Sequence, residues 1–327
     1  MHAEEQVLSL LRMHKGYVSA KALAKEAGIS ISGISKRIRI LRKYGYNIES
    51  NNRLGYKLIA KTGLPVPWEL AKVLNTHFLG KDKILYRLTA DSTQKLAILL
   101  AEKKPSSEGI VIIADQQTGG RGRENRKWLS PSGGIWLSVI LRPTTSASKI
   151  TVLPFAVAIA VCEAIRETTH LNPKLRWPND VMINGKKVAG VLIDISMEAD
   201  QINYAIIGIG INANVDSLAL SSFLESHMKV TSISDELGYK ISILELTRIT
   251  LEHLEYHYLQ LRDSIPHAII EMWKDNSDVL HHKVEVIGKH LTIKGIVEDV
   301  KDDGSLLVRT HDGRDINVVA SEVRVRF

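Results

Sequence analysis

The sequence predicts an α+β protein of three domains: a winged helix-turn-helix domain at residues 1–63, a central α+β domain with a mixed sheet at 64–275, and a small β-rich domain at 276–327. Three observations support this prediction. The chain has 327 residues, more than the ~250–300 at which a single hydrophobic core stops growing. Its formal net charge of +7 is confined to the first 60 residues, which contain 11 Lys and Arg residues and four acidic ones. Strands and helices alternate in the middle of the chain, and short strands with Asp-Gly turns follow at its end.

The first domain is predicted to contain three helices. Val7 and Leu11 belong to the apolar stripe of a first helix, and Ser19 is expected to cap a second helix that ends at Gly28. Ser30 is expected to cap a third helix that runs to about residue 44. Four residues of this third helix recur at helical spacing and are expected to face the core, namely Ile31, Ile34, Ile38 and Leu41.

Residues 47–58 predict a β-hairpin that would form a wing, with Arg53 at its tip. Two helices across a Gly turn, the second with a basic outer face, are typical of DNA-binding domains, and the local excess of positive charge indicates a polyanionic partner. The alternative is a small helical domain whose basic face is only solvated. The candidate DNA-contacting residues are Ser30, Ser32, Ser35, Lys36, Arg37, Arg39 and Arg53.

The central domain is expected to begin after a linker that contains Pro65 and Pro67. Helices are predicted at residues 68–79, 93–102, 152–168, 241–262 and 265–274, and strands at 83–88, 109–114, 134–141, 175–177, 181–183, 187–195 and 203–211. Short turns between neighbouring strands favour an antiparallel or mixed sheet with helices on one side. No GxGxxG motif opens a helix and no Walker A motif is present, so nucleotide binding of the Rossmann or P-loop type is not expected.

The most informative segment follows the strand predicted at residues 109–114. It reads Gly119-Gly120-Arg121-Gly122-Arg123-Glu124-Asn125-Arg126-Lys127-Trp128. A Gly-rich loop can wrap its backbone N–H groups around an anion, and arginines add planar guanidinium groups that match carboxylate and phosphate oxygens. The segment therefore predicts a site for one small anion, or for two anions held against each other. A flexible basic surface loop and an RGG-like nucleic-acid-binding segment are the alternatives.

Four further segments accompany this loop. They are Asp91-Ser92-Thr93-Gln94, Arg176-Trp177-Pro178-Asn179-Asp180, the turn and strand from Gly185-Lys186-Lys187 to Ile193, and Ile206-Ile207-Gly208-Ile209-Gly210-Ile211-Asn212. In their order and spacing the five segments resemble the biotin protein ligases, most closely the bifunctional members that are also biotin operon repressors, over roughly the whole chain. The resemblance implies an enzyme that forms biotinyl-5'-AMP from biotin and ATP with Mg²⁺. It also implies transfer of the biotin to a lysine of a biotin carboxyl carrier protein, and binding to an operator as a biotin-responsive repressor.

The resemblance also implies a class II synthetase-like central domain, an SH3-like C-terminal barrel and a set of site residues. The candidate catalytic residues are Lys187, Arg121 and Arg123. The candidate biotin-binding residues are Ser92, Thr93, Gln94, Gln117, Gly120, Arg121, Gly122, Arg123, Lys187 and Gly190. The candidate ATP- or adenylate-binding residues are Arg123, Arg126, Trp128, Asn179, Asp180 and Asn212. Asp180 is also the candidate Mg²⁺ ligand, because hard oxygen ligands suit this ion.

The residue types fit this chemistry. Activation of a carboxylic acid by ATP brings a carboxylate and an α-phosphate together, and two anions can meet only beside fixed cations. Arg121, Arg123 and Lys187 are the candidates for that position, whereas the neighbouring Lys186 is expected to be a solvated turn residue.

The ureido ring of biotin has N–H donors and a carbonyl acceptor, and each group left unpaired on burial costs ~1–3 kcal/mol. Ser92 and Thr93 can pair with such a ring, and can equally cap the following helix. Trp128 can pack over a ligand or lie in the core. Two features depart from the family pattern, Glu124-Asn125 within the basic loop and Arg176 in place of the usual lysine.

The C-terminal domain is predicted to contain five short strands, at residues 283–286, 291–297, 306–310, 315–319 and 323–327, with hairpin turns that suit an SH3-like barrel. His281, His282 and His290 show no spacing typical of a metal site and are expected on the surface.

Other features exclude several protein classes. The one cysteine, Cys162, lies in an apolar helical run and is expected to be a core residue and not a nucleophile. No apolar run reaches ~18 residues without charge, so a membrane span is not expected. The N-terminus lacks the pattern of a signal peptide, so a cytoplasmic protein is expected.

Three alternative functions stay open at this point. The chain could be a transcription regulator whose central domain only senses a ligand, a lipoate-type ligase, or a biotin ligase whose DNA-binding domain has no regulatory role. A homodimer is expected when the adenylate is bound, because the loop at residues 121–128 and the segment after Asn212 could order over the adenylate and create a dimer surface.

Overall fold

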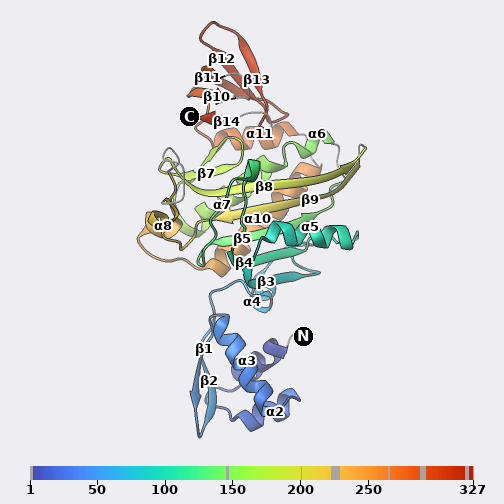
Figure 1. Cartoon of the computed structure of the whole chain (residues 1–327), viewed down its shortest axis with the longest axis vertical. Helices are drawn as coiled ribbons and strands as arrows, with labels where there is room; N and C mark the ends of the chain where they lie inside the picture. The colour runs from blue at the N-terminus through green and yellow to red at the C-terminus, as the bar shows by residue number, and fades with distance from the viewer. Residues whose placement is uncertain are drawn as a thin grey trace. The chain divides into compact units, whose positions relative to one another are not determined.

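The computed structural model describes residues 3–105, 107–144, 147–199, 201–221, 229–263, 266–287, 292–320 and 324–326. The chain forms two compact units, Met1–Lys72 and Val73–Phe327 (Figure 1). The expectations above that concern Ile265, His290, Leu291, Val323 and Phe327, and part of the segment after Asn212, fall outside the described residues.

The first unit contains the three predicted helices and the predicted hairpin. The helices are α1 (Ala3–Met13), α2 (Ala20–Ala27) and α3 (Ile31–Lys43), and the antiparallel hairpin is formed by β1 (Asn47–Asn51) and β2 (Gly55–Ala60). The helices of this unit bury most completely the apolar side chains of Val7, Leu8, Leu11, Leu23, Ile34, Ile38, Leu41 and, in α4 (Pro67–Val73), Leu70. The prediction that Ile31 faces this core was wrong, because Ile31 is the first residue of α3 and its side chain is 52% exposed.

Both predicted helix caps are confirmed. Ser19 Oγ accepts a hydrogen bond from Ala22 N at 3.1 Å, and Ser30 Oγ accepts one from Gly33 N at 3.0 Å. A cap of this kind stabilises a helix by about 1 kcal/mol. Gly28 ends α2 with φ 64°, a left-handed conformation that glycine adopts without steric cost.

The helix predicted at residues 68–79 is shorter than expected and joins the first unit. It is α4 (Pro67–Val73), in which the Trp68 indole N–H donates a 2.6 Å hydrogen bond to the Tyr46 hydroxyl. Beyond Val73 the backbone N–H groups of Phe78 and Leu79 each donate to the Glu255 carboxylate at 2.9 Å. A carboxylate far along the chain thus replaces the hydrogen bonds that a longer helix would have made.

Seven strands form the central sheet of the second unit, in the order β3-β4-β5-β9-β8-β7-β6. They are β3 (Ile84–Ala90), β4 (Val111–Gln117), β5 (Ile135–Leu141), β6 (Lys174–Arg176), β7 (Asp180–Ile183), β8 (Lys186–Glu198) and β9 (Gln201–Ile211). β3 and β4 pair in parallel, and the other neighbouring strands pair antiparallel. The predicted mixed sheet is therefore confirmed.

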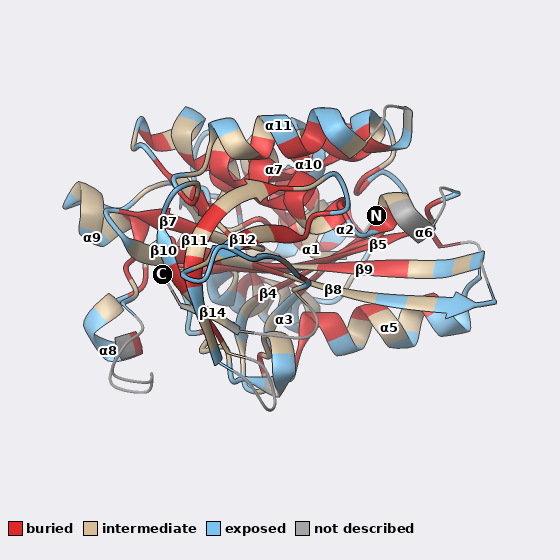
Figure 2. Ribbon diagram, turned by 90° about the horizontal axis from the view of Figure 1, so that it is seen from above, coloured by how far each residue is buried: buried red, intermediate tan, exposed pale blue. Residues whose placement is uncertain are grey.

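The prediction that helices cover one side of this sheet was wrong. The principal helices are α5 (Thr93–Lys103), α7 (Leu153–Thr169), α10 (Ile243–Asp263) and α11 (Pro266–Asp275), with shorter α6 (Ala147–Ile150), α8 (Ser217–Ser221) and α9 (Ile233–Leu237). Figure 2 shows α5 on one side of the sheet and α7 and α10 on the other. Every residue of β5 is buried, which is typical of a strand covered on both faces and not of a one-sided sheet.

The C-terminal strands form a five-stranded antiparallel sheet in the order β13-β12-β11-β10-β14. They are β10 (Lys283–Ile287), β11 (Thr292–Val300), β12 (Leu306–Thr310), β13 (Asp315–Val318) and β14 (Arg324–Arg326). The Trp177 indole N–H donates to the Gly304 carbonyl at 2.9 Å, which fixes this sheet to the central domain. None of the described helices is long and apolar enough to cross a membrane.

Candidate functional site

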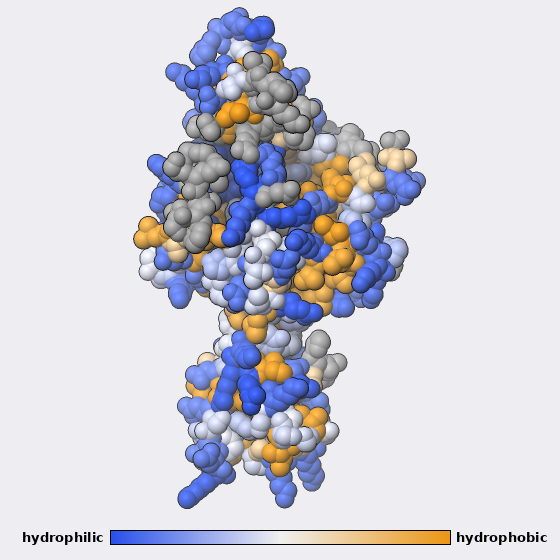
Figure 3. All heavy atoms as spheres, viewed as in Figure 1, coloured by the Kyte–Doolittle hydropathy of each residue, from blue (hydrophilic) through white to orange (hydrophobic). Residues whose placement is uncertain are grey.

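A pocket of about 540 Å³ opens where the loop at residues 117–129 crosses the central sheet. Its walls come from the N-terminus of α5, from strands β5, β7, β8 and β9, and from Val325 of the C-terminal sheet. In Figure 3, hydrophilic side chains gather on the visible face of the central domain next to the C-terminal sheet. The predicted site segments, which lie far apart in the sequence, therefore meet in one cavity.

The pocket is strongly basic. Seven basic side chains line it, namely Arg121, Arg123, Arg126, Lys127, Arg176, Lys187 and Lys229. Asp180 is the one carboxylate among its described lining residues. Such a lining attracts anionic ligands and can hold more than one negative group at a time.

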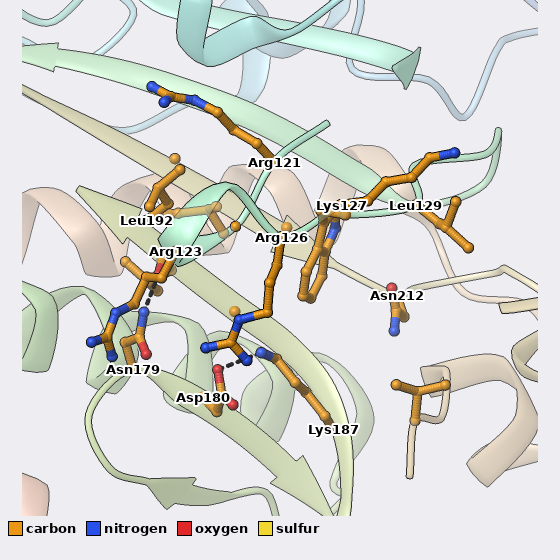
Figure 4. A pocket seen from close by; sticks show the side chains of 18 of the residues that line it. Arg121, Arg123, Arg126, Lys127, Leu129, Asn179, Asp180, Lys187, Leu192 and Asn212 are labelled. Atoms are coloured by element: carbon orange, nitrogen blue, oxygen red, sulfur yellow. Dashed lines mark hydrogen bonds and ion pairs between the residues drawn. The ribbon is translucent and has the colours of Figure 1, made fainter. Parts of the chain in front are cut away.

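Lys187 and Asp180 face each other from neighbouring strands. The Lys187 ammonium nitrogen lies 2.5 Å from an Asp180 carboxylate oxygen and 5.0 Å from the centre of the Trp128 ring. The backbone of Lys187 is held as well, because its N–H donates to Lys229 O and its carbonyl accepts from Thr231 N, both at 2.9 Å. Figure 4 shows Lys187, Asp180 and Arg126 directed at the same part of the pocket.

Lys186 differs from Lys187 in both position and partner. It does not line the pocket, and its ammonium group pairs with the Glu236 carboxylate at 2.8 Å. The two adjacent lysines of the turn thus face different surroundings, as the alternation of side chains along a strand requires.

Trp128 lies against the glycines of the pocket floor. A Cβ atom at Gly210 would come within 2.7 Å of the Trp128 indole nitrogen, and one at Gly190 within 3.3 Å of the Trp128 ring. The Trp128 indole N–H is buried and has no hydrogen-bond partner among the described residues. The ring thus leaves no room for side chains larger than glycine at positions 190 and 210.

Arg121 lines the pocket but does not point at Lys187 (Figure 4). Its guanidinium group lies 2.6 Å from an Asp194 carboxylate oxygen, and the Gln94 amide donates to the same oxygen at 3.0 Å. The sequence prediction placed Arg121 and Lys187 together at the meeting point of two anions. In this structure Asp194 holds Arg121 at a different wall of the same cavity.

Arg123 is held by the C-terminal part of the chain, since its guanidinium group donates to the Ala320 carbonyl. Burial lowers the pKa of Arg123 from its usual value, against the opposing effect of the nearby Glu124 and Asp180 charges. A partly desolvated guanidinium interacts with an anion more strongly than an exposed one does.

Neutral polar side chains fill the end of the pocket beside α5. Gln117 Oε1 accepts a hydrogen bond from Thr93 N at 2.8 Å, and the Thr93 and Ser138 hydroxyls lie 2.9 Å apart. The Ser138 hydroxyl in turn donates to Gln94 Oε1 at 2.9 Å. Ser92 caps α5 by accepting from Lys95 N at 3.4 Å and also lines the pocket, so both roles considered for it are compatible.

Asn179 and Asn212 line the pocket with side-chain amides already bonded to the backbone. The Asn179 amide donates to the Val191 carbonyl, and the Asn212 amide donates to the Thr231 carbonyl at 3.0 Å. Both side chains therefore tie strands and loops together at the pocket rim.

The basic loop is closed by its own backbone. Gly122 N donates to Arg126 O at 2.7 Å, and Trp128 N donates to Gly120 O at 2.9 Å. Gly120 does not line the pocket, contrary to the sequence prediction, because it is buried beneath the loop, where a Cβ would lie 2.4 Å from Trp128 O. Glu124 adopts φ 55° and pairs with Arg126 at 3.5 Å, so the acidic departure from the family pattern engages one of the loop's own cations.

The other predicted site residues of the central domain all line the pocket. They are Ser92, Thr93, Gln94, Gln117, Arg121, Gly122, Arg123, Arg126, Trp128, Asn179, Asp180, Lys187, Gly190 and Asn212. Sequence reasoning missed Ser138, Lys229 and Val325 of the lining, and also Asp194, which holds Arg121. Ser138 carried a signal, since it is a lone hydroxyl in the apolar strand Ile135–Leu141, whereas nothing local marked Asp194 or Val325.

The predicted DNA-contacting residues divide into two groups. Lys36, Arg39 and Arg53 are exposed. The others make contacts within the first unit: Arg37 pairs with Glu4 at 3.1 Å, Ser35 bonds to Tyr56 of the hairpin at 3.2 Å, and Ser32 bonds to the capping Ser30 at 3.0 Å. The basic face is present, although part of it stabilises the domain.

Comparison with known proteins gives matches over nearly the whole chain. Residues 85–212 match the model of the biotin/lipoate A/B protein ligase family, and residues 4–57 match a helix-turn-helix domain. The bifunctional ligase/repressor BirA of Bacillus subtilis is 34% identical over 301 residues, which cover 91% of this chain and 90% of that protein. The protein of the same name from Escherichia coli is 25% identical, over 89% and 87%. A solved structure of the biotin protein ligase from Aquifex aeolicus in complex with biotin and ATP aligns with a TM-score of 0.62 and 28% identity, over 75% of this chain and 98% of that one.

Proposed function

The chain belongs to the biotin/lipoate A/B protein ligase family, among its members with an N-terminal helix-turn-helix domain, and we propose that it is a biotin protein ligase that also represses transcription. In the first step, a biotin carboxylate oxygen attacks the α-phosphorus of ATP, which forms biotinyl-5'-AMP and releases pyrophosphate. In the second, the amine of an acceptor lysine attacks the acyl carbon and AMP leaves. The acceptor is the biotin carboxyl carrier domain of a biotin-dependent carboxylase.

The observation that carries the proposal is the composition of the pocket. Seven basic side chains surround a cavity with a single carboxylate among its described lining residues, and a neutral polar end adjoins them. A carboxylate and a triphosphate repel each other, so a pocket that joins them needs this excess of positive charge. Its volume of about 540 Å³ lies within the usual ~300–1,000 Å³ range of small-molecule sites.

Lys187 is the residue proposed to stabilise the reacting groups. Its ammonium group stands at the pocket surface with Asp180 on one side and the Trp128 ring on the other. It can therefore contact the biotin carboxylate and the α-phosphate as negative charge shifts between them. Arg126 is directed at the same part of the pocket and would hold phosphate oxygens, and Arg123 lines the same cavity (Figure 4).

The neutral polar end is proposed to hold the ureido ring. Thr93, Gln94, Gln117 and Ser138 offer both donors and acceptors there, which the ring's N–H and carbonyl groups require. Each of these side chains already makes hydrogen bonds, so the network is oriented before a ligand arrives. The aliphatic chain of biotin would then run from this end towards Lys187, past the Trp128 ring, which itself covers Gly190 and Gly210.

Mg²⁺ is proposed to enter with ATP and not through a dedicated protein cage. One Asp180 oxygen faces Lys187, which leaves the second oxygen for a hard cation, and no other described lining residue offers a carboxylate. One protein carboxylate plus substrate phosphates is a usual arrangement for this ion. The bound ion would supply charge neutralisation for the leaving pyrophosphate.

We propose that residues 1–63 bind DNA and that residues 64–275 bind biotin and ATP. Residues 276–327 are proposed to form an SH3-like barrel that helps to close the pocket. Two observations support the role of the last domain: Val325 lines the pocket, and Arg123 donates a hydrogen bond to the Ala320 carbonyl. Residues 1–63 are proposed to bind an operator, and biotinyl-5'-AMP is proposed to promote a homodimer that places two such domains on two half-sites.

Competition binding tests the choice of substrate. Labelled biotin should bind the purified chain, unlabelled biotin should displace it, and lipoate at equal concentration should not. Displacement by lipoate as effective as that by biotin would identify a lipoate-type ligase instead. The regulatory half is tested separately by an operator-shift assay and sedimentation, in which biotin plus ATP should raise both DNA binding and the dimer fraction. Equal DNA affinity with and without these ligands would refute the regulatory half.

A further inference from the structure

A cluster of histidine and carboxylate side chains joins the two helices on the sheet face opposite α5, where α7 and α10 run side by side (Figure 2). Glu163 of α7 and His253 and His257 of α10 bring ligand atoms within 4.8 Å of one another. None of the three lines the pocket or belongs to the helix-turn-helix unit. The proposed ligase and repressor activities therefore leave this cluster without a role.

The two imidazole rings converge on one carboxylate oxygen. Glu163 Oε2 lies 2.6 Å from His257 Nε2 and 3.1 Å from His253 Nδ1. The second nitrogen of His253 lies 2.9 Å from a carboxylate oxygen of Glu167, one turn further along α7. The rings are nearly parallel, with an angle of 17° between their planes.

The spacing of these residues suits chelation. His253 and His257 are four residues apart on α10, as are Glu163 and Glu167 on α7, so each pair projects from one face of its helix. Two histidines at this spacing are a common pair of Zn²⁺ ligands, and a carboxylate from a neighbouring element is a common third.

Burial and charge also suit a cation. The His257 side chain is 1% exposed, whereas those of Glu163 and His253 are 27% and 26% exposed, which leaves a path from solvent. The two rings lie against the carboxylates of Glu163 and Glu167. Two carboxylates thus face two imidazoles, and a divalent cation bound to neutral rings would balance both negative charges.

We propose that Glu163, His253 and His257 form a binding site for a divalent transition metal of the Zn²⁺ type, which links α7 to α10. Zn²⁺ bonds to nitrogen and oxygen of ~2.0–2.2 Å place the ligand atoms of a tetrahedral site roughly 3.4 Å apart. The observed separations of 2.6 and 3.1 Å need to widen by less than ~1 Å. Metal binding replaces the protons that the rings share with Glu163, and Glu167 or a water molecule fills the fourth position.

The site is tested on the full-length protein with Zn²⁺ alone as the probe, after treatment with a chelator and dialysis. The wild type should bind one equivalent of Zn²⁺ in equilibrium dialysis, and its melting temperature should rise when Zn²⁺ is added, because the metal binds the folded state. Co²⁺ at the same site should give the visible absorption of a tetrahedral complex. Glu163→Gln and His253→Gln should each bind Zn²⁺ at least tenfold more weakly and lose the rise in melting temperature.

His282→Gln is the matched control, because it removes an exposed histidine outside the cluster and should bind Zn²⁺ as the wild type does. Circular dichroism verifies that each variant is folded, and the partly exposed His253 provides a second variant if Glu163→Gln unfolds. The proposal is overturned if the wild type binds no Zn²⁺, or if Zn²⁺ binds Glu163→Gln and His253→Gln as tightly as the wild type. In either case the cluster would be an ion-pair clamp between the two helices.

Discussion

Replacement of Lys187 by alanine should abolish most of the adenylation activity. At an effective dielectric constant of ~20, two unit charges about 4 Å apart interact by ~4 kcal/mol. Removal of a single donor aimed at developing charge costs ~10²–10³ in kcat, or ~3–4 kcal/mol. The Lys187 side chain is 18% exposed, so solvent can replace little of its interaction with the reacting groups. We therefore expect a fall in kcat of about 10²–10³-fold for Lys187→Ala.

The fold should survive this change. The Asp180 carboxylate keeps 28% of its surface exposed at the open pocket, so water can solvate it when the lysine is removed. Lys186→Ala is the matched control, because it removes the adjacent lysine, which pairs with Glu236 outside the pocket lining. Its kcat should remain within about twofold of the wild type, since surface changes away from the site have small effects.

The assay is single-turnover formation of biotinyl-5'-AMP at saturating biotin and ATP, with the melting temperature measured on the same samples. Saturation separates a loss of transition-state stabilisation from weaker substrate binding. A Lys187→Ala enzyme that forms the adenylate at near wild-type rate, or a Lys186→Ala enzyme equally impaired, would refute the role assigned to Lys187.

Three further predictions concern other parts of the molecule. Arg121→Gly removes the cation that Asp194 holds at the pocket wall and should release biotinyl-5'-AMP, measured as biotin on lysines of unrelated proteins; a slower enzyme without stray labelling would contradict this. Arg39→Ala should weaken operator binding in a gel-shift assay while ligase activity is unchanged. The slope of log affinity against log salt concentration should fall by about one, the contribution of one phosphate contact. Arg37→Ala tests DNA binding less cleanly in the same assay, because it also breaks the ion pair with Glu4 within the domain. Tyr46→Phe removes the hydroxyl that accepts the Trp68 indole hydrogen bond and leaves that buried donor unsatisfied. The free energy of unfolding, measured by urea titration, should fall by ~1–3 kcal/mol. An unchanged urea midpoint would show that this hydrogen bond does not contribute to stability.

The elements that the sequence predicted well are those with local causes. Ser19 and Ser30 cap their helices because a hydroxyl beside the first turn can reach a free backbone N–H, whatever the rest of the chain does. The helix expected at residues 68–79 ends at Val73, and the N–H groups of Phe78 and Leu79 donate to the Glu255 carboxylate, far along the chain, and not to the carbonyls of a continuing helix. No local pattern contains that interaction.

The site shows the same division. Lys187 and Trp128 were candidates from the sequence because short segments with unusual glycines and cations are visible in it, and both line the pocket. The partner of Arg121 was not visible in the sequence. Asp194 belongs to β8, far along the chain, and approaches Arg121 only in the folded protein. Gly120 lies outside the pocket lining, and its lack of a side chain allows the loop to pack closely on Ser130 and Trp128, a contact that no local pattern announces.

The central claim is that this basic pocket joins the carboxylate of biotin to the α-phosphate of ATP. Exchange of labelled pyrophosphate into ATP tests it most directly, because the exchange requires reversible formation of an acyl-adenylate. We predict exchange that depends on biotin, is not supported by lipoate, and falls by about 10²-fold or more in Lys187→Ala. No biotin-dependent exchange by the folded wild-type protein, with Mg²⁺ present, would contradict the claim and favour a pocket that only senses its ligand.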